Sequence, residues 1–89
     1  RFVVNVLGAG QDALATHFAS RLPDKFSMLE HRLDAHGLPR LPGAIATLGC
    51  RVVSEVDGGT HSIFIGEVED AGHAPGAPLG YFRGRFVAV

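Results

Sequence analysis

The stretch Thr60–Val68, THSIFIGEV, directly follows the dipeptide Gly58-Gly59 and decides how this chain folds. Apolar-rich runs lie on both sides of the two glycines, over Ala44–Val56 and His61–Ala71. Two-residue hairpin turns need positive φ angles, which glycine adopts at low steric cost. The pattern therefore predicts a long antiparallel hairpin that turns at Gly58-Gly59, and it places His61 at the mouth of that hairpin.

Both strands of the predicted hairpin carry apolar residues on each of their faces. In the first strand Leu48, Cys50 and Val52 alternate with Ile45 and Val53, and in the second Ile63 and Ile65 alternate with Phe64 and Val68. A strand that is apolar on both sides has to be covered on both sides. A barrel interior covers one face, so we expect a second subunit or a complementing segment on the other.

The remaining elements are short and are separated by glycine and proline. Phe2–Leu7 is apolar and β-branched, which predicts a buried strand, and the apolar spacing of Gln11–Ser20 predicts a helix that ends before Pro23. Leu79–Phe82 and Arg85–Val89 predict a short final hairpin or a bent strand. One helix among several strands indicates a mainly β domain of the α+β class, part of a small antiparallel barrel.

The connection Asp24–Pro42 is poorly periodic and rich in proline and glycine, which predicts a loop. Four apolar residues within it, Phe26, Met28, Leu29 and Leu33, could pack as a short helical turn. A connection of this length inside a compact domain often covers or lines a functional site.

Size and composition bound the function. The 89 residues carry a net charge of −1 and are 46% hydrophobic, which suits one small domain. A single cysteine excludes an internal disulfide and favours the cytoplasm. Basic residues are dispersed and no apolar run approaches 18 residues, so we expect neither nucleic acid nor membrane as a partner. Because the chain opens on Arg1 and immediately enters a strand, we expect it to be a piece of a larger protein.

His61 is the first candidate for chemistry. It is either a polar residue beside the turn or a hydrogen-bond donor at a barrel rim, where ligands often bind. The other four histidines lack the spacing of metal ligands, so no metal site is predicted. Cys50 has no base with a recognisable relation to it, which favours a buried structural thiol.

Two further motifs have an ordinary and a functional interpretation. Gly8-Ala9-Gly10 follows a strand and precedes a helix, but the third glycine of a dinucleotide-binding turn is missing, so a simple strand break is favoured. Its amides and the helix N-terminus could still hold a phosphate. Tyr81, Arg83 and Arg85 belong either to a solvated final strand or to an aromatic and basic patch beside an anionic cofactor.

Taken in order, five segments of the chain resemble the C-terminal half of the FMN-binding split-barrel flavin reductases, which supply reduced flavin to two-component monooxygenases. The segments are Phe2–Ser20, Asp24–Phe26, Gly37–Val52, Asp57–Gly72 and Pro78–Phe86, and they cover nearly the whole chain. The resemblance implies that residues 1–89 are the C-terminal portion of one split-barrel domain, whose intact form is a homodimer with flavin at its interface.

The resemblance also implies a reaction and a set of site residues. The reaction is hydride transfer from NADH or NADPH to FMN or FAD, and the reduced flavin diffuses to a monooxygenase component. His61 matches the family histidine near the nicotinamide and flavin. Asn5, Leu7 and Gly8 match a strand end that approaches the flavin, and Tyr81 and Arg83 match a C-terminal segment beside it.

Two departures from the family pattern keep alternatives open. Thr60 stands where the family usually has aspartate, and the half that holds most of the flavin has no counterpart in these residues. The alternatives to a reductase are a flavin-binding split-barrel module without turnover and a dimerising structural remnant.

Overall fold

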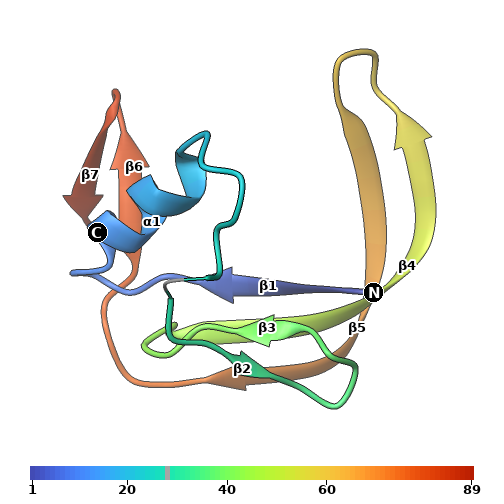
Figure 1. The fold of residues 1–89 in the computed structure, drawn as a ribbon, viewed down its shortest axis with the longest axis horizontal. Helices are drawn as coiled ribbons and strands as arrows, with labels where there is room; N and C mark the ends of the chain where they lie inside the picture. Colours follow the sequence, from blue (N-terminus) through green and yellow to red (C-terminus); the bar gives the residue numbers. More distant parts are fainter. Residues whose placement is uncertain (28) are drawn as a thin grey trace.

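The computed structural model describes residues 1–27 and 29–89 and confirms the expected fold class, a mainly β structure with one helix among these residues (Figure 1). Its main sheet has three antiparallel strands in the order β1-β4-β5. These strands are β1 (Phe2–Val6), β4 (Ala46–Asp57) and β5 (Ser62–His73). The prediction of a strand at the N-terminus is therefore confirmed.

The predicted hairpin at Gly58-Gly59 is also confirmed. Strand β4 pairs with β5 from Ala46 opposite His73 to Asp57 opposite Ser62. The Gly58 N–H donates to the His61 carbonyl at 2.8 Å, and Gly59 has a φ of 83°, so a glycine stands where the turn needs a positive angle.

Two β-bulges interrupt the ladder of this hairpin. The pairing shifts between Gly49 and Cys50 and again between Val52 and Ser54. The first shift leaves Glu69 as the extra residue on β5, and the second leaves Val53 as the extra residue on β4. Because bulges increase local twist, the tip of the hairpin bends away from the sheet and stands clear of the rest of the chain (Figure 1).

The predicted helix is confirmed as α1 (Asp12–Ala19). With eight residues, it is far too short for a bilayer-spanning helix, and no other helix occurs in the described part of the chain. After Ser20 turns the backbone to an extended conformation, the Lys25 ammonium group reaches back and donates to the carbonyls of Phe18 and Ser20. This contact closes the C-terminal end of the helix.

The connection predicted as a loop contains a short ribbon of two strands, β2 (Arg32–Leu33) and β3 (Pro39–Arg40). Two-residue strands are too short to produce a periodic pattern, which is why they were not predicted. The ribbon depends instead on Asp34, whose carboxylate accepts the N–H groups of His36 at 2.9 Å and Leu38 at 3.1 Å.

The helical turn predicted in the same connection is partly wrong. The Leu29 N–H donates to the Phe26 carbonyl at 3.2 Å, as in a turn. Leu33, however, lies in β2 and is 63% exposed, so it does not pack with Phe26 and Leu29. Met28 lies outside the described residues.

The C-terminal residues form the predicted hairpin, with strands β6 (Leu79–Phe82) and β7 (Arg85–Ala88). The hairpin begins beside the end of β1, because the Leu79 N–H donates to the Leu7 carbonyl at 3.0 Å and Gly8 forms a bridge with Pro78. Helix α1 and this hairpin thus occupy the side of the molecule away from the β4–β5 tip (Figure 1).

The core is small. Among the described hydrophobic residues, Cys50 alone counts as buried, at 6% exposed, as expected for a structural thiol. The pairing register places large apolar side chains on both faces of the β4–β5 hairpin, in line with the alternation read from the sequence. Six of them are about half exposed: Val53, Val56, Ile63, Phe64, Ile65 and Val68.

Candidate functional site

The structure places the six predicted site residues in two separate regions. Asn5, Leu7 and Gly8 lie at the end of β1, and Tyr81 and Arg83 lie on the β6–β7 hairpin that starts there. His61 lies instead at the tip of the β4–β5 hairpin, which projects on its own in Figure 1. Within a single chain the base of the β6–β7 hairpin meets the end of β1, whereas Arg83 lies at the turn of that hairpin and His61 lies on the separate β4–β5 tip.

Gly8 is closely packed at the end of β1. It is buried, and a Cβ atom placed on it would lie 3.0 Å from the Ile45 Cγ2 atom and 3.4 Å from the Gly43 carbonyl oxygen. Its N–H donates to the Gln11 side-chain oxygen at 2.8 Å. Strand β1 thus ends at a buried glycine whose Cβ side is already filled by the Ile45 side chain and the Gly43 backbone.

Asn5 already has partners for both atoms of its side-chain amide. Its Nδ2 group donates to the Pro39 carbonyl at 3.3 Å, and its Oδ1 atom accepts the Leu41 N–H at 3.0 Å. Direct contact between Asn5 and a flavin remains a prediction, whereas its contact with the 39–41 backbone is observed.

The β6–β7 hairpin gathers the predicted aromatic and basic residues. Tyr81 is 66% exposed, and its ring meets that of Phe86 edge to face at a centroid distance of 5.1 Å. Arg83 occupies the turn with a φ of 53°, and its guanidinium carbon lies 5.3 Å from the centroid of the Phe82 ring. The hairpin therefore presents open aromatic faces next to a cationic group.

His61 is exposed and has one side-chain partner. Its Nδ1 atom lies 2.9 Å from the Thr60 hydroxyl oxygen. In the tautomer where Nδ1 accepts the hydroxyl proton, Nε2 carries the ring proton and is available as a donor. Thr60 can therefore orient the imidazole but adds no negative charge.

A groove of about 850 Å³ lies between the connection that precedes β4 and the base of the β4–β5 hairpin. The sequence did not predict which residues line it. The prediction that the connection before β4 lines a site agrees with this groove, since residues 30–34 and 40–44 form its walls and residues 46, 47 and 72–74 complete it. None of the six predicted site residues lines it. The sequence did contain a signal for the turn in the groove wall. It is the pair Asp34 and Gly37 within DAHGLPR, because aspartate and glycine at this spacing are typical of a tight turn.

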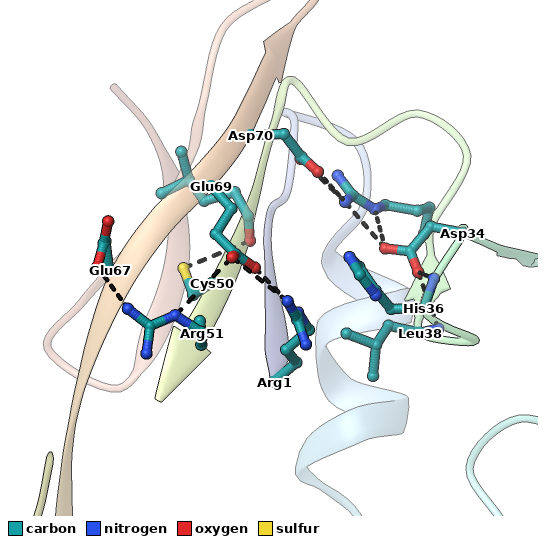
Figure 2. Close-up of polar contacts among 11 residues, drawn as sticks. Arg1, Asp34, His36, Leu38, Cys50, Arg51, Glu67, Glu69 and Asp70 are labelled. Atoms are coloured by element: carbon teal, nitrogen blue, oxygen red, sulfur yellow. Dashed lines mark hydrogen bonds and ion pairs between the residues drawn. The ribbon is translucent and has the colours of Figure 1, made fainter. Parts of the chain in front are cut away.

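An ion network fixes the wall of this groove to the main sheet (Figure 2). The Arg40 guanidinium contacts Asp34 at 2.9 Å and Asp70 on β5 at 3.0 Å. Both contacts raise the pKa of Arg40. The Leu38 N–H is the main cause that lowers the pKa of Asp34, with His36 and Arg40 contributing. Asp34 thus holds Arg40 within the ribbon, and Arg40 joins the ribbon to β5.

A second group of ion pairs covers the same face of the sheet near the N-terminus (Figure 2). Arg1 contacts Glu69 at 2.9 Å, and this pair is the main cause that lowers the pKa of Glu69. Arg51 contacts Glu67 at 2.7 Å. Each of these carboxylates is paired with an arginine at the surface, so they form a solvated charged face. Within the described residues, no three His, Cys, Asp or Glu side chains form a cluster that could hold a metal.

All 89 residues match the family described as "Flavin reductase like domain". The reductase component of 4-nitrophenol 4-monooxygenase/4-nitrocatechol 2-monooxygenase from Rhodococcus opacus is 48% identical over 85 residues, which are 96% of this chain and 45% of that protein. The FMN reductase (NADH) of Agrobacterium fabrum is 38% identical over 85 residues, which are 96% of this chain and 48% of that protein.

The fold has the same relatives. The NADH:FAD oxidoreductase of Streptomyces globisporus, solved in complex with NAD and FAD fragments, superposes with a TM-score of 0.88 at 38% identity. The superposition covers 96% of this chain and 53% of that protein. The chain thus spans about half the length of the relatives that it matches.

Proposed function

This chain belongs to the flavin reductase like domain family, and from that premise we propose that it is part of an NADH- or NADPH-dependent flavin reductase. The family match over the whole chain carries the proposal, and relatives named as an FMN reductase and a monooxygenase reductase component support it. Residues 1–89 then form the C-terminal portion of the domain. FMN or FAD receives the hydride and diffuses, reduced, to a monooxygenase component in the cytoplasm.

The residues at the end of β1 and on the β6–β7 hairpin have the chemistry to hold one side of a flavin. A bound flavin would supply the two-electron acceptor, and the protein supplies position and charge. Leu7 and Gly8 lie at the closely packed end of β1, and Tyr81 offers an exposed ring for stacking. Arg83 would offset negative charge on the flavin or its phosphate.

The position of His61 supports a second chain or segment as part of the same proposal. The hairpin tip projects away from the β6–β7 hairpin within one chain (Figure 1). His61 can therefore serve as a hydrogen-bond donor at the flavin only where its tip meets the site of another copy or of a complementing segment. The half-exposed apolar residues along β4 and β5 give such a partner a surface to cover.

The His61→Ala variant tests the catalytic assignment. Loss of a donor aimed at the reacting ring should slow the oxidation of NADH in the presence of FMN by about tenfold or more. The fold should remain, because the His61 side chain is exposed and its ring contacts only Thr60 among described polar groups.

The matched control is His36→Ala, which removes an exposed imidazole from the β2–β3 turn and should leave the rate unchanged. An unaltered rate in His61→Ala would contradict the assignment of His61.

Thr60 favours a second candidate, a split-barrel module that binds flavin without turnover, because it lacks the usual aspartate charge. Mixing the purified protein with FMN and then with NADH separates the candidates. A yellow complex that oxidises NADH supports the reductase, whereas a yellow complex without oxidation supports the binding module. Absence of bound flavin would support a structural, dimerising role.

A further inference from the structure

Two side-chain amides connect the beginning of the chain to the Pro39–Gly43 segment. Asn5 donates to the Pro39 carbonyl and accepts the Leu41 N–H. Gln11 accepts the Gly8 N–H at 2.8 Å and donates to the Pro42 carbonyl at 3.0 Å. We name Asn5 and Gln11 the amide clamp, because each uses one donor and one acceptor to join two backbone segments more than 30 residues apart in sequence.

An amide can make both of these contacts at once, whereas an ionised carboxylate cannot. A carboxylate has the same shape but accepts only, so it would place a negative oxygen against the carbonyl of Pro39 or Pro42. Packing also leaves little freedom, since a Cβ atom on Gly43 would lie 2.7 Å from the Gln11 Nε2 atom. The clamp is therefore a specific arrangement of hydrogen bonds within close packing.

The segments joined by the clamp are those that matter for a ligand. One contains Leu7 and Gly8, the strand end proposed to approach the flavin. The other contains Leu41, Pro42 and Gly43, which line the 850 Å³ groove. The backbones of Gly8 and Gly43 are in close contact, because a Cβ on Gly8 would lie 3.4 Å from the Gly43 carbonyl oxygen.

We propose that Asn5 and Gln11 are positioning residues of the flavin site, which fix the strand end at Gly8 against the groove wall at Leu41–Gly43. This inference rests on the proposed reductase function. In this proposal Asn5 acts indirectly, because it holds the backbone at Pro39 and Leu41. A displaced Gly8 or groove wall changes how well a flavin fits, while the exposed groups on the β6–β7 hairpin and at His61 stay as they are.

The test uses Asn5→Asp and Gln11→Glu in the protein as it purifies, in its own oligomeric form, with FMN and NADH as probes. The KM for FMN should rise about tenfold, because the half-buried Pro39 carbonyl or the exposed Pro42 carbonyl loses its donor and faces a negative carboxylate oxygen. The kcat should change less than about threefold. At pH 5 the KM defect of Asn5→Asp should shrink, because a protonated carboxyl group can donate to Pro39 again, whereas Asn5→Ala should show no recovery.

Glu67→Gln is the matched control, since it exchanges a carboxylate and an amide on the exposed face of the sheet and should keep the wild-type KM. Amide hydrogen exchange of Leu41 and Gly8 adds a readout independent of activity and should accelerate in Asn5→Ala and Gln11→Met respectively.

Two results overturn the inference alone: variants of an active protein that keep the wild-type KM, or losses of activity that only follow the fraction unfolded. A wild-type protein that does not oxidise NADH with FMN overturns the proposed function and this inference with it.

Discussion

At the residue scale, two positions in the main sheet require glycine because other side chains pass directly over them. A Cβ on Gly49 would lie 2.8 Å from an Asp70 carboxylate oxygen and 2.9 Å from an Arg40 guanidinium nitrogen. A Cβ on Gly66 would lie 2.6 Å from the Phe2 ring. Both glycines sit inside strands, so their value here lies in the space that they leave for an ion pair and an aromatic ring.

Gly66→Ala should destabilise the protein by about 1–3 kcal/mol, because the added methyl group forces the Phe2 ring off its position over β5. Urea unfolding measures the change. Gly72→Ala is the control on the same strand, since its Cβ would meet only the Thr47 hydroxyl at an ordinary 3.5 Å. Equal stabilities of the two variants would contradict the packing argument.

At the scale of elements, the residues Asp24-Lys25-Phe26 act together to end helix α1 and start the next turn. The Asp24 carboxylate accepts the N–H groups of Phe26 and Ser27, both at 3.1 Å. The Phe26 ring meets Phe18 of the helix at a centroid distance of 5.3 Å. With the Lys25 ammonium on the last helical carbonyls, one tripeptide supplies a cap, a turn and a packing contact.

Lys25→Ala should lower the melting temperature by about 4–8 °C, because a lost charged hydrogen bond of about 1 kcal/mol has that effect in a domain of this size. Circular dichroism at 222 nm follows the change. Arg21→Ala removes an exposed cation nearby and should melt like the wild type. If both variants melt alike, Lys25 does not support the helix end.

Two paired carboxylates, Asp34 in the β2–β3 turn and Glu69 on β5, should make the free energy of unfolding depend on pH in the acid range. The pKa of Asp34 is lowered from its ordinary 3.8, and that of Glu69 from 4.5. A lowered folded pKa means that the stabilisation is present above the ordinary value and is lost as the pH falls through the folded one. The urea concentration at which half of the wild type is unfolded should therefore decrease as the pH is lowered below about 4. Asp34→Asn should show a weaker dependence on pH.

Glu30→Gln is the control for that experiment, because Glu30 is exposed and makes no hydrogen bond among the described residues. It should follow the wild-type curve. An Asp34→Asn curve parallel to the wild type would mean that Asp34 does not contribute to the pH dependence.

At the scale of the whole molecule, the chain is more open than its size predicts. Its accessible surface is 6522 Å², whereas a folded monomer of this mass exposes about 5,000 Å². Its radius of gyration is 14.1 Å, against about 12 Å for a compact domain of 89 residues. The projecting β4–β5 hairpin with its half-exposed apolar residues contributes to the difference.

Phe64→Lys should weaken self-association if a second copy covers this hairpin, because a lysine in an apolar contact loses its hydration. Sedimentation velocity of the purified protein measures the shift toward monomer. Thr16→Lys adds the same charge on helix α1 and should leave assembly unchanged. A wild-type chain that sediments as a monomer would contradict association between copies and leave a complementing segment as the cover.

The elements predictable from sequence were those with local signals. Gly58-Gly59 predicted the long hairpin directly, whereas Gly84 predicted a break that fitted either a short hairpin or a bent strand. The β2–β3 ribbon could not, because its strands have two residues each and its attachment to β5 needs Arg40 to reach Asp70, 30 residues further along the chain. The bulges at Val53 and Glu69 were equally hidden, since an extra residue exists only relative to a partner strand.

The candidate site was less predictable than the fold. The roles of Leu7, Gly8, Tyr81 and Arg83 at a flavin stay predictions, and the partners of the Asn5 amide lie 34 and 36 residues away and have no local signature. The place where His61 acts depends on a surface that a single chain does not complete.

The two bulges have a consequence for aligning relatives of this chain. Each strand of the hairpin carries one surplus residue, and the two cancel, so the tip at Asp57 and Ser62 is back in the same pairing frame as the base at Ala46 and His73. A relative that lacks one residue near Val53 and another near Glu69 would have a straighter arm with its turn intact. Two small gaps at these places, although far apart in the sequence, would then record a single change of shape.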